Sequence, residues 1–402
     1  MPTHHSLISD VSNNNDTSLT KQVLPGLDAL NSGQSNEILR FLRNRKIGLL
    51  TNHTGRAREG GSTLSVLRAL DLNVVALFSP EHGFAGDSEG HVASSQYATL
   101  PLHSLYGTAR SPSAQMLAGI EVLICDLQDV GARFYTYIST LAHCMEECAK
   151  HDIAIVVFDR PNPLGGQAIE GPLIENELRS FIGYLDIPIR HGMTMGELAL
   201  LYQSDVDLNV ELRVAKILNW KREIQWPQTN LEWPVPSPNL PDFQSAAWYP
   251  GTCLLEFSKL SVGRGTNAPF QIVGAPWAST KGVLPLLRDE PIFAENFVGE
   301  VLNFTPTRGE YAGELCHGLK FSTPDGAIPI SIVPLGLCLL SALHRAQPDE
   351  FDEAKMQASL PLLGAEGVLP LLRDGEIKAA LEIAEKDAEE FRKRRGEFLI
   401  YD

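Results

Sequence analysis

Short apolar runs alternate with amphipathic stretches along the first 160 residues of the chain. Four of these runs have a continuous apolar centre and lie at 46–52, 73–79, 122–126 and 153–159. Two stretches between them, 62–70 and 134–150, repeat their apolar residues with the spacing of a helix. Continuous apolar strands separated by helices are typical of a parallel sheet covered on both faces. We therefore predict an α/β fold with a Rossmann-like parallel sheet at the N-terminus.

The pattern of apolar and polar residues changes twice along the chain, and these changes predict a lead-in and two domains. Residues 1–24 are polar and lack both the basic start and the apolar stretch of a secretory signal, so we expect a disordered lead-in. A Rossmann-like catalytic domain follows at 25–168. Gly, Pro and Asn then become dense, and we expect a second, mixed α/β domain that binds substrate at 169–402. This domain closes on a helix whose apolar positions, from Ile377 to Phe391, recur every three or four residues.

Polar residues follow each of the four predicted strands. They are Asn52 and His53, then Glu81 and His82, then Asp126, Asp129 and Arg133, and finally Arg160 and Asn162. Ligands of open α/β sheets bind at the carboxyl ends of the strands, so we expect these side chains to share one site. Turn chemistry alone is the alternative for each cluster, because Asn, Asp and Gly also form turns.

Carboxylates in these clusters suggest acid–base chemistry. Glu81 lies between a proline and a glycine on a rigid turn, where partial burial can raise its pKa enough for it to donate a proton. The alternative is a salt bridge within the loop. Asp126 and Asp129 could supply a second carboxyl group for glycoside hydrolysis, or could hold Mg²⁺ or Ca²⁺. Glu197 follows Thr194 in a capping box, which favours a structural role.

Composition narrows the partners and cofactors. The chain has 49 acidic and 33 basic residues, a net charge of −16, which argues against nucleic-acid binding. No apolar run reaches the ~18–20 residues of a membrane span, so we expect no membrane insertion. No phosphate-loop motif occurs, no dinucleotide motif follows the first predicted strand, and the six cysteines include no C-x-x-C pair. We therefore expect no cofactor and no metal, and the sequence does not predict the oligomeric state.

Three later segments have the composition of a sugar site. They are 233–239, stiffened by prolines and ending at Asn239; 248–251, aromatic and close to Glu256; and 261–266, with Arg264 between glycines. Aromatic faces can stack on the C–H groups of a sugar ring, while Asn, Arg and Glu bond to its hydroxyl groups. Tryptophans that simply fill the core are the alternative.

The motifs together resemble a known family, the exo-β-N-acetylmuramidases of bacterial cell-wall turnover. The resemblance is carried by TNHTG (51–55), SPEHGFAG (79–86), LPLHSLYG (100–107), DLQDVGARFYTY (126–137), DRPNPLGG (159–166), SFIG (180–183), RHGMTMGELA (190–199), PSPNLP (236–241), YPG (249–251) and GRGTNAPFQIVGAPW (263–277). It implies a Rossmann-like domain, a smaller C-terminal α/β domain and an active site between them. The implied reaction removes terminal N-acetylmuramic acid from the non-reducing end of peptidoglycan fragments.

Two features depart from the family's pattern. After Glu256 the chain has Phe257-Ser258-Lys259-Leu260, where the family usually carries Gly, Thr and Asn. Secreted members have an export signal that this sequence lacks. We therefore expect a cytoplasmic enzyme acting on imported fragments, or a secreted one if the recorded start omits a leader.

We assign expected roles on this basis. Glu81 is the general acid, His82 tunes it, and Asp129 or Asp126 is the base or nucleophile. Candidates for the lactyl carboxylate of muramic acid are Arg133, Arg160, His191 and Arg264. Candidates for other substrate contacts are Asn52, Tyr135, Asn162, Asn239 and Glu256.

Two other functions remain open at this point. One is a metal-assisted hydrolase of another sugar derivative, using His53, His82, Asp126 and Asp129. The other is a muropeptide-binding protein without catalysis, which would tolerate the loss of Glu81.

Overall fold

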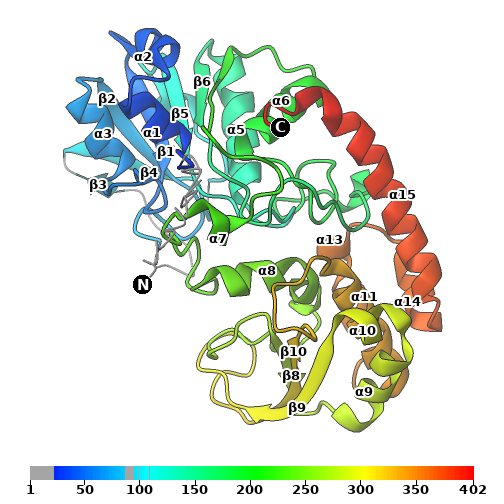
Figure 1. Ribbon diagram of the computed structural model, residues 1–402. Helices are drawn as coiled ribbons and strands as arrows, with labels where there is room; N and C mark the ends of the chain where they lie inside the picture. The colour runs from blue at the N-terminus through cyan, green and yellow to red at the C-terminus, as the bar shows by residue number, and fades with distance from the viewer. Residues whose placement is uncertain (1–21, 87–94, 98, 108) are drawn as a thin grey trace, which may run out of the picture.

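The computed structural model describes residues 22–86, 95–97, 99–107 and 109–402 and forms two lobes (Figure 1). The elements of the first lobe are α1 (Gly26–Asn31), α2 (Asn36–Leu42), β1 (Ile47–Thr51), α3 (Thr63–Ala69), β2 (Val74–Ser79), β3 (Ser95–Tyr97), β4 (Leu100–Ser104), α4 (Ala114–Leu117), β5 (Val122–Asp126), α5 (Tyr137–Lys150), β6 (Ala154–Phe158), a 3₁₀ turn (Asn176–Leu178), α6 (Met195–Asp205), β7 (Leu212–Ala215) and α7 (Trp226–Thr229).

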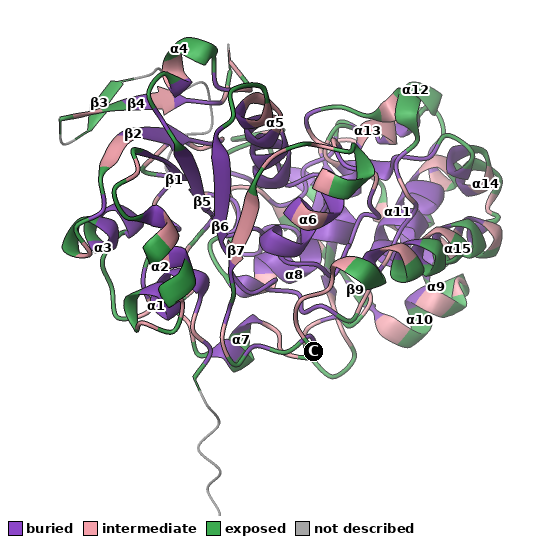
Figure 2. Ribbon diagram, turned by 90° about the horizontal axis from the view of Figure 1, so that it is seen from above, coloured by how far each residue is buried: buried purple, intermediate pink, exposed green. Residues whose placement is uncertain are grey.

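A seven-stranded sheet forms the centre of this lobe, in the order β3-β4-β2-β1-β5-β6-β7. Six neighbouring strands, β4-β2-β1-β5-β6-β7, are parallel to one another. The remaining strand of this sheet, β3, pairs antiparallel with β4. Alternate residues of each strand enter different cores. Ile124 packs with α1, α2 and α3 on one face, whereas Leu123 packs with α5 and α6 on the other. The central strands are consequently buried on both sides (Figure 2), which explains their continuous apolar sequence.

The predicted α/β fold with a Rossmann-like sheet is confirmed, and all four predicted strands are present as β1, β2, β5 and β6. Strand β7 was not predicted, although it pairs with β6 through Val156 and Arg213. The sheet therefore extends to Ala215, and the boundary expected after residue 168 falls inside the part of the chain that builds it. Of the expected lead-in, 1–21 lies outside the described residues, and Leu24 bridges Leu218.

The second lobe packs helices on a small antiparallel sheet of order β8-β10-β9. Its elements are α8 (Phe243–Thr252), a 3₁₀ turn (Cys253–Leu255), β8 (Ile272–Ala275), α9 (Thr280–Asp289), α10 (Pro291–Asn296), β9 (Val298–Phe304), β10 (Cys316–Ser322), α11 (Val333–Ala346), α12 (Glu353–Gln357), α13 (Leu360–Leu363), α14 (Val368–Asp374), α15 (Ile377–Arg395) and a last 3₁₀ turn (Gly396–Phe398).

Helix α15 returns the chain from the second lobe to the first, as its red ribbon in Figure 1 shows. Most positions of its predicted apolar face, including Ala384 and Phe391, are buried, while Leu381 is partly buried. Near its end Arg395 donates to the carbonyl oxygens of His191 and Gly192 in the first lobe. The C-terminal end of α15 is therefore bound to the first lobe. None of the helices in the described ranges has the length and apolar character needed to span a bilayer.

Candidate active site

A cavity of about 280 Å³ lies between the two lobes. The first lobe contributes Glu81, His82, Tyr106, Phe134, Tyr135, Thr136 and Ile182, and the second lobe and the segment before it contribute Ser237, Asn239, Leu240, Tyr249, Cys253, Glu256, Phe257, Arg264, Phe270 and Leu362. Its size is close to the lower end of small-molecule pockets, ~300–1,000 Å³. The cavity can therefore hold one sugar residue with its substituents.

The turn after β2 brings Glu81 and His82 into this cavity. His82 has φ 69°, a left-handed conformation that is uncommon outside glycine and that functional sites often retain. The Thr136 hydroxyl donates a 2.6 Å hydrogen bond to Glu81 Oε2. Burial, together with the nearby Glu81 carboxylate, raises the pKa of Tyr106 to about 12. Glu81 is thus held in one orientation while its side chain stays half-buried.

A second carboxylate, that of Glu256, enters the cavity from the other lobe. Its Oε1 lies 2.5 Å from Arg264 Nη2, and its Oε2 accepts from Cys253 Sγ at 3.1 Å. Both members of the ion pair are about one-quarter exposed, so each can still meet a ligand. Among the described residues, Glu81 and Glu256 are the carboxylates that line this cavity.

Two tyrosines in contact build one wall of the cavity: Tyr135 lines the cavity, and Tyr137 is buried against Tyr135. Tyr135 and Tyr137 both donate their hydroxyls to the carbonyl oxygen of Pro236, at 2.8 and 3.0 Å. Asn52 donates to the Tyr137 hydroxyl and accepts from the backbone N–H and hydroxyl of Thr54. Tyr135 faces the cavity, whereas Asn52 lies behind the wall and fixes it in place.

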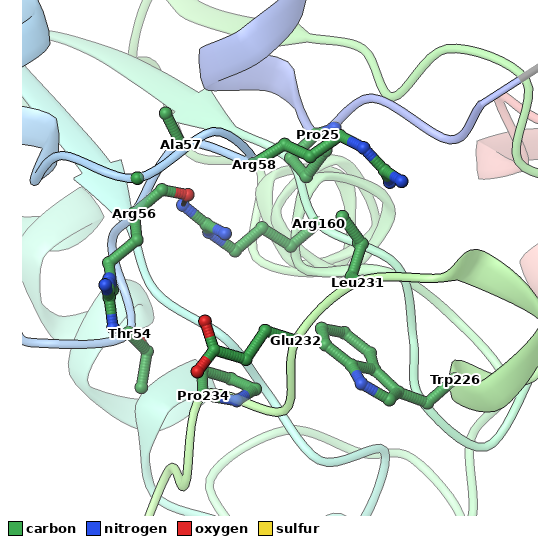
Figure 3. A pocket seen from close by; sticks show the side chains of 11 residues that line it. Pro25, Thr54, Arg56, Ala57, Arg58, Arg160, Trp226, Leu231, Glu232 and Pro234 are labelled. Atoms are coloured by element: carbon green, nitrogen blue, oxygen red, sulfur yellow. Dashed lines mark hydrogen bonds between the residues drawn. The ribbon is translucent and has the colours of Figure 1, made fainter.

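Asp126 and Arg160 are paired with each other outside the cavity lining. Arg160 Nε lies 2.5 Å from Asp126 Oδ1, Nη2 lies 3.1 Å from Oδ2, and Thr63 donates to Oδ2 as well. Asp126 is fully buried. Arg160 instead borders a separate, smaller pocket, where Figure 3 shows it between Arg56 and Glu232. The expectation that Asp126 shares a pocket with Glu81 is therefore wrong.

Asp129 is also buried behind the wall, next to His191. Its Oδ2 accepts from Gly131 N–H at 2.7 Å and lies 3.7 Å from His191 Nε2, while Oδ1 has no partner. Burial raises the pKa of Asp129 to about 7 and lowers that of His191 to about 3, the latter with help from the charges of Arg395, Arg190 and Arg133. Neither side chain lines the cavity.

The buried Arg133 and Asn162 bind backbone rather than facing the cavity. Arg133 donates to the carbonyl oxygens of four residues in both lobes, Pro172, Ile187, Leu362 and Leu363, at 2.7–2.9 Å. Asn162 donates to Met193 O and accepts from Leu164 N–H. Both terminal nitrogens of Arg133 and the amide of Asn162 thus bind backbone, and neither residue lines the cavity. This contradicts the expected substrate contacts and indicates turn and packing roles instead.

The structure brings six of the thirteen predicted site residues to one cavity: Glu81, His82, Tyr135, Asn239, Glu256 and Arg264. It also adds residues that were not predicted individually, notably Tyr106, Thr136 and Phe257. Tyr106 and Thr136 lie within motifs that had been noted, SLYG and FYTY, so a local signal for them existed. Phe257 had none, since it interrupts the motif pattern.

The residues named for a metal-assisted reaction point to different partners. His53 Nε2 lies 2.9 Å from Val235 O, Asp126 pairs with Arg160, and Asp129 accepts from a backbone N–H. In the part of the chain that the structure describes, no three His, Cys, Asp or Glu side chains are grouped closely enough to hold a metal ion.

Comparison with known proteins gives consistent matches over nearly the whole chain. Residues 47–244 match the N-terminal family model of the exo-β-N-acetylmuramidase NamZ, and residues 247–401 match the C-terminal one. The peptidoglycan β-N-acetylmuramidase NamZ of Bacillus subtilis (strain 168) is 35% identical over 393 residues, covering 96% of this chain and 93% of that protein.

Solved structures agree. Two crystal structures of DUF1343 family proteins from Bacteroides fragilis NCTC 9343 are each 30% identical to this chain. The first has a TM-score of 0.84, and the match covers 95% of this chain and 99% of that chain. The second has a TM-score of 0.74, and the match covers 94% of this chain and 99% of that chain. Matches to both family models, in order and over most of the sequence, leave one conclusion: the chain belongs to the NamZ family of exo-β-N-acetylmuramidases.

Proposed function

We propose that this protein is an exo-acting glycosidase that releases terminal N-acetylmuramic acid from the non-reducing end of peptidoglycan fragments. One observation carries the proposal: a cavity large enough for one sugar holds Glu81 on one lobe and the Glu256–Arg264 pair on the other. Membership of the family supports the same reaction.

Glu81 is the general acid in this proposal. Its position is supported by the hydrogen bond from Thr136, which leaves the other carboxyl oxygen, Oε1, for a substrate. Protonation of the glycosidic oxygen by a positioned carboxyl group allows the aglycone sugar to leave as an alcohol. His82, next in the chain and facing the same cavity, remains a candidate for tuning Glu81.

We assign the second carboxyl function to Glu256 rather than to Asp126 or Asp129. Glycosidases need a second carboxylate that stabilises the oxocarbenium-like transition state as nucleophile, or activates water as base. Glu256 lines the cavity and stays about one-quarter exposed, whereas the buried Asp126 and Asp129 do not line it.

Arg264 is the proposed receptor for the lactyl carboxylate. The overall charge of −16 repels an anion, so a local cation must bind it. Arg264 is the arginine that lines the cavity, and, among the described residues, its Nε has no hydrogen-bond partner beside the Nη2 contact with Glu256. Arg133 and Arg160 have their donors directed at backbone and Asp126 instead. Asn239 and Tyr135 are candidates for hydroxyl or N-acetyl contacts.

The test is sugar release from a chromogenic β-N-acetylmuramide, compared with the matching β-N-acetylglucosaminide. We expect turnover of the muramide, a clear preference over the glucosaminide, and no loss of activity in EDTA. Binding without turnover would favour the muropeptide-binding alternative, and loss in EDTA would favour a metal-assisted one. The cytoplasmic location expected from the sequence stays a prediction, which cell fractionation can test.

A further inference from the structure

The turn after Glu256 has its polar and apolar side chains in the reverse of the usual arrangement. Phe257 is 45% exposed, while the next residue, Ser258, is fully buried and its hydroxyl has no hydrogen-bond partner. Burial normally favours the opposite choice, because a phenylalanine ring gains far more from leaving water than a hydroxyl does. The ring of Phe257 is thus open to solvent at the edge of the cavity that it lines, where a ligand can reach it.

The backbone holds this turn firmly in that arrangement. Ser258 N–H donates to Leu255 O at 3.0 Å, and the Tyr311 hydroxyl donates to Lys259 O at 3.2 Å. Lys259 has φ 56°, which reverses the chain directly after Ser258. The ring of Phe257 is therefore presented on a fixed support rather than on a loose loop.

The cavity itself has a closed end and an open rim. Phe270, Cys253 and Asn239 are at most 2% exposed and form its closed end. Phe257 lies at the rim together with the half-buried Ile182 and Tyr106. A glycosidase that removes terminal sugars places that sugar in the closed end, so the rest of the substrate must pass the rim.

We propose that Phe257 forms the binding site for the aglycone sugar, stacking its ring on the C–H face of the hexosamine that follows the terminal N-acetylmuramic acid. Aromatic rings bind sugars in this way because the C–H face is apolar and the ring face carries a negative quadrupole. The inference rests on the proposed function. It gives a role in substrate choice to Phe257, a position where this chain departs from the sequence pattern of the family.

The test compares Phe257→Ala with the wild type on two ligands. One is the β-1,4-linked disaccharide of N-acetylmuramic acid and N-acetylglucosamine, followed by kcat/KM. The other is free N-acetylmuramic acid, followed by its inhibition constant. We expect kcat/KM on the disaccharide to fall about three- to tenfold, the range of an aromatic contact, and the inhibition constant of the monosaccharide to stay unchanged.

Further variants separate stacking from general packing. Phe257→Trp keeps an aromatic face and should retain at least wild-type kcat/KM, whereas Phe257→Leu should behave like Phe257→Ala. Phe41→Ala on α2, a partly exposed aromatic residue in contact with Arg45 and Arg213, is the matched control and should change neither value.

Three results would overturn the inference. One is an unchanged kcat/KM for Phe257→Ala on the disaccharide. Another is an equal loss of affinity for free N-acetylmuramic acid, which would show that Phe257 binds the terminal sugar instead. A wild-type chain that releases no N-acetylmuramic acid would overturn the proposed function, and this inference with it.

Discussion

The Thr136 hydroxyl donates a 2.6 Å hydrogen bond to the Glu81 carboxylate, and this contact joins the turn after β2 to the residue that precedes α5. Thr136 therefore selects the orientation in which Glu81 faces the cavity. A single hydroxyl thereby connects two strand-end segments, after β2 and after β5, that both contribute to the site.

Glu81→Gln should keep the fold and lose most turnover. The amide has nearly the same volume but cannot donate the proton that the leaving oxygen needs, and general acid–base assistance contributes ~10²–10⁴-fold. The measurement is kcat on a substrate with a poor leaving group, with circular dichroism as a check of folding. Glu300→Gln, on an exposed position of β9, is the control. A Glu81→Gln rate close to that of wild type would remove Glu81 from the mechanism.

Arg264→Met should narrow the preference for a muramide over a glucosaminide. Loss of a charged hydrogen bond to the lactyl carboxylate costs ~1.5–3 kcal/mol, about 10- to 150-fold in kcat/KM on the muramide. Loss of the ion pair with Glu256 affects both sugars alike and cancels in their ratio. The ratio of kcat/KM on the two sugars is the quantity to measure. Arg288→Met, on the exposed side of α9, is the matched control. If the ratio stays at the wild-type value, Arg264 does not bind the lactyl group.

Arg133→Met should affect stability rather than specificity. The change removes the donors of four buried carbonyl oxygens, and each unsatisfied buried acceptor costs ~1–3 kcal/mol. We expect a loss of at least about 3 kcal/mol in the free energy of unfolding, measured in urea, with an unchanged preference between the two sugars in the folded fraction. A stable variant with a lost preference would restore Arg133 as a substrate ligand.

Asp129 should make stability depend on pH near neutrality. Burial raises its pKa to about 7, from a usual value of 3.8, so the folded state binds its proton more tightly than the unfolded state does. The resulting stabilisation is complete below about pH 4 and is lost as pH rises to about 7, by up to ~1.4 kcal/mol per pH unit.

The comparison that checks this is Asp129→Asn against wild type, by urea unfolding at pH 5 and pH 8. The variant should gain stability relative to wild type at pH 8, because asparagine can accept from Gly131 N–H without carrying a charge. Asp349→Asn, at an exposed position, should follow the wild type. Equal pH dependence in Asp129→Asn and wild type would show that Asp129 is not protonated in the folded state.

Most of the first lobe could be predicted because its central strands are buried on both faces and are therefore apolar throughout. Strand β7 was not predicted because it lies at the edge of the sheet, where Leu212 and Arg213 are both partly exposed and the sequence is not continuously apolar. Local turn chemistry accounts for two wrong predictions, since Asn52 and Asn162 accept hydrogen bonds from backbone N–H groups two residues further along the chain.

Two arginines, Arg133 and Arg264, show a different reason why the site could not be predicted from the sequence. Arg133 and Arg264 both lie close to glycines in polar motifs, and nothing local separates a packing residue from a cavity residue. What separates them is distant: Arg133 meets the carbonyls of Leu362 and Leu363, about 230 positions further along the chain. The place of Glu256 in the cavity could not be predicted for the same reason, because only the folded lobes show what this side chain faces.

Helix α15 has a mechanical consequence for the enzyme. The chain enters the second lobe through α8 and leaves it through α15, whose last turn is fixed to the first lobe by Arg394 on Asp186 and Arg395 on His191. Because the second lobe is joined to the first at two separated points, it cannot rotate as freely as a lobe joined through a single hinge. We therefore expect the lobes to keep a nearly constant spacing during the catalytic cycle, with sugar entry and exit governed by the stiffness of the 256–259 turn at the rim.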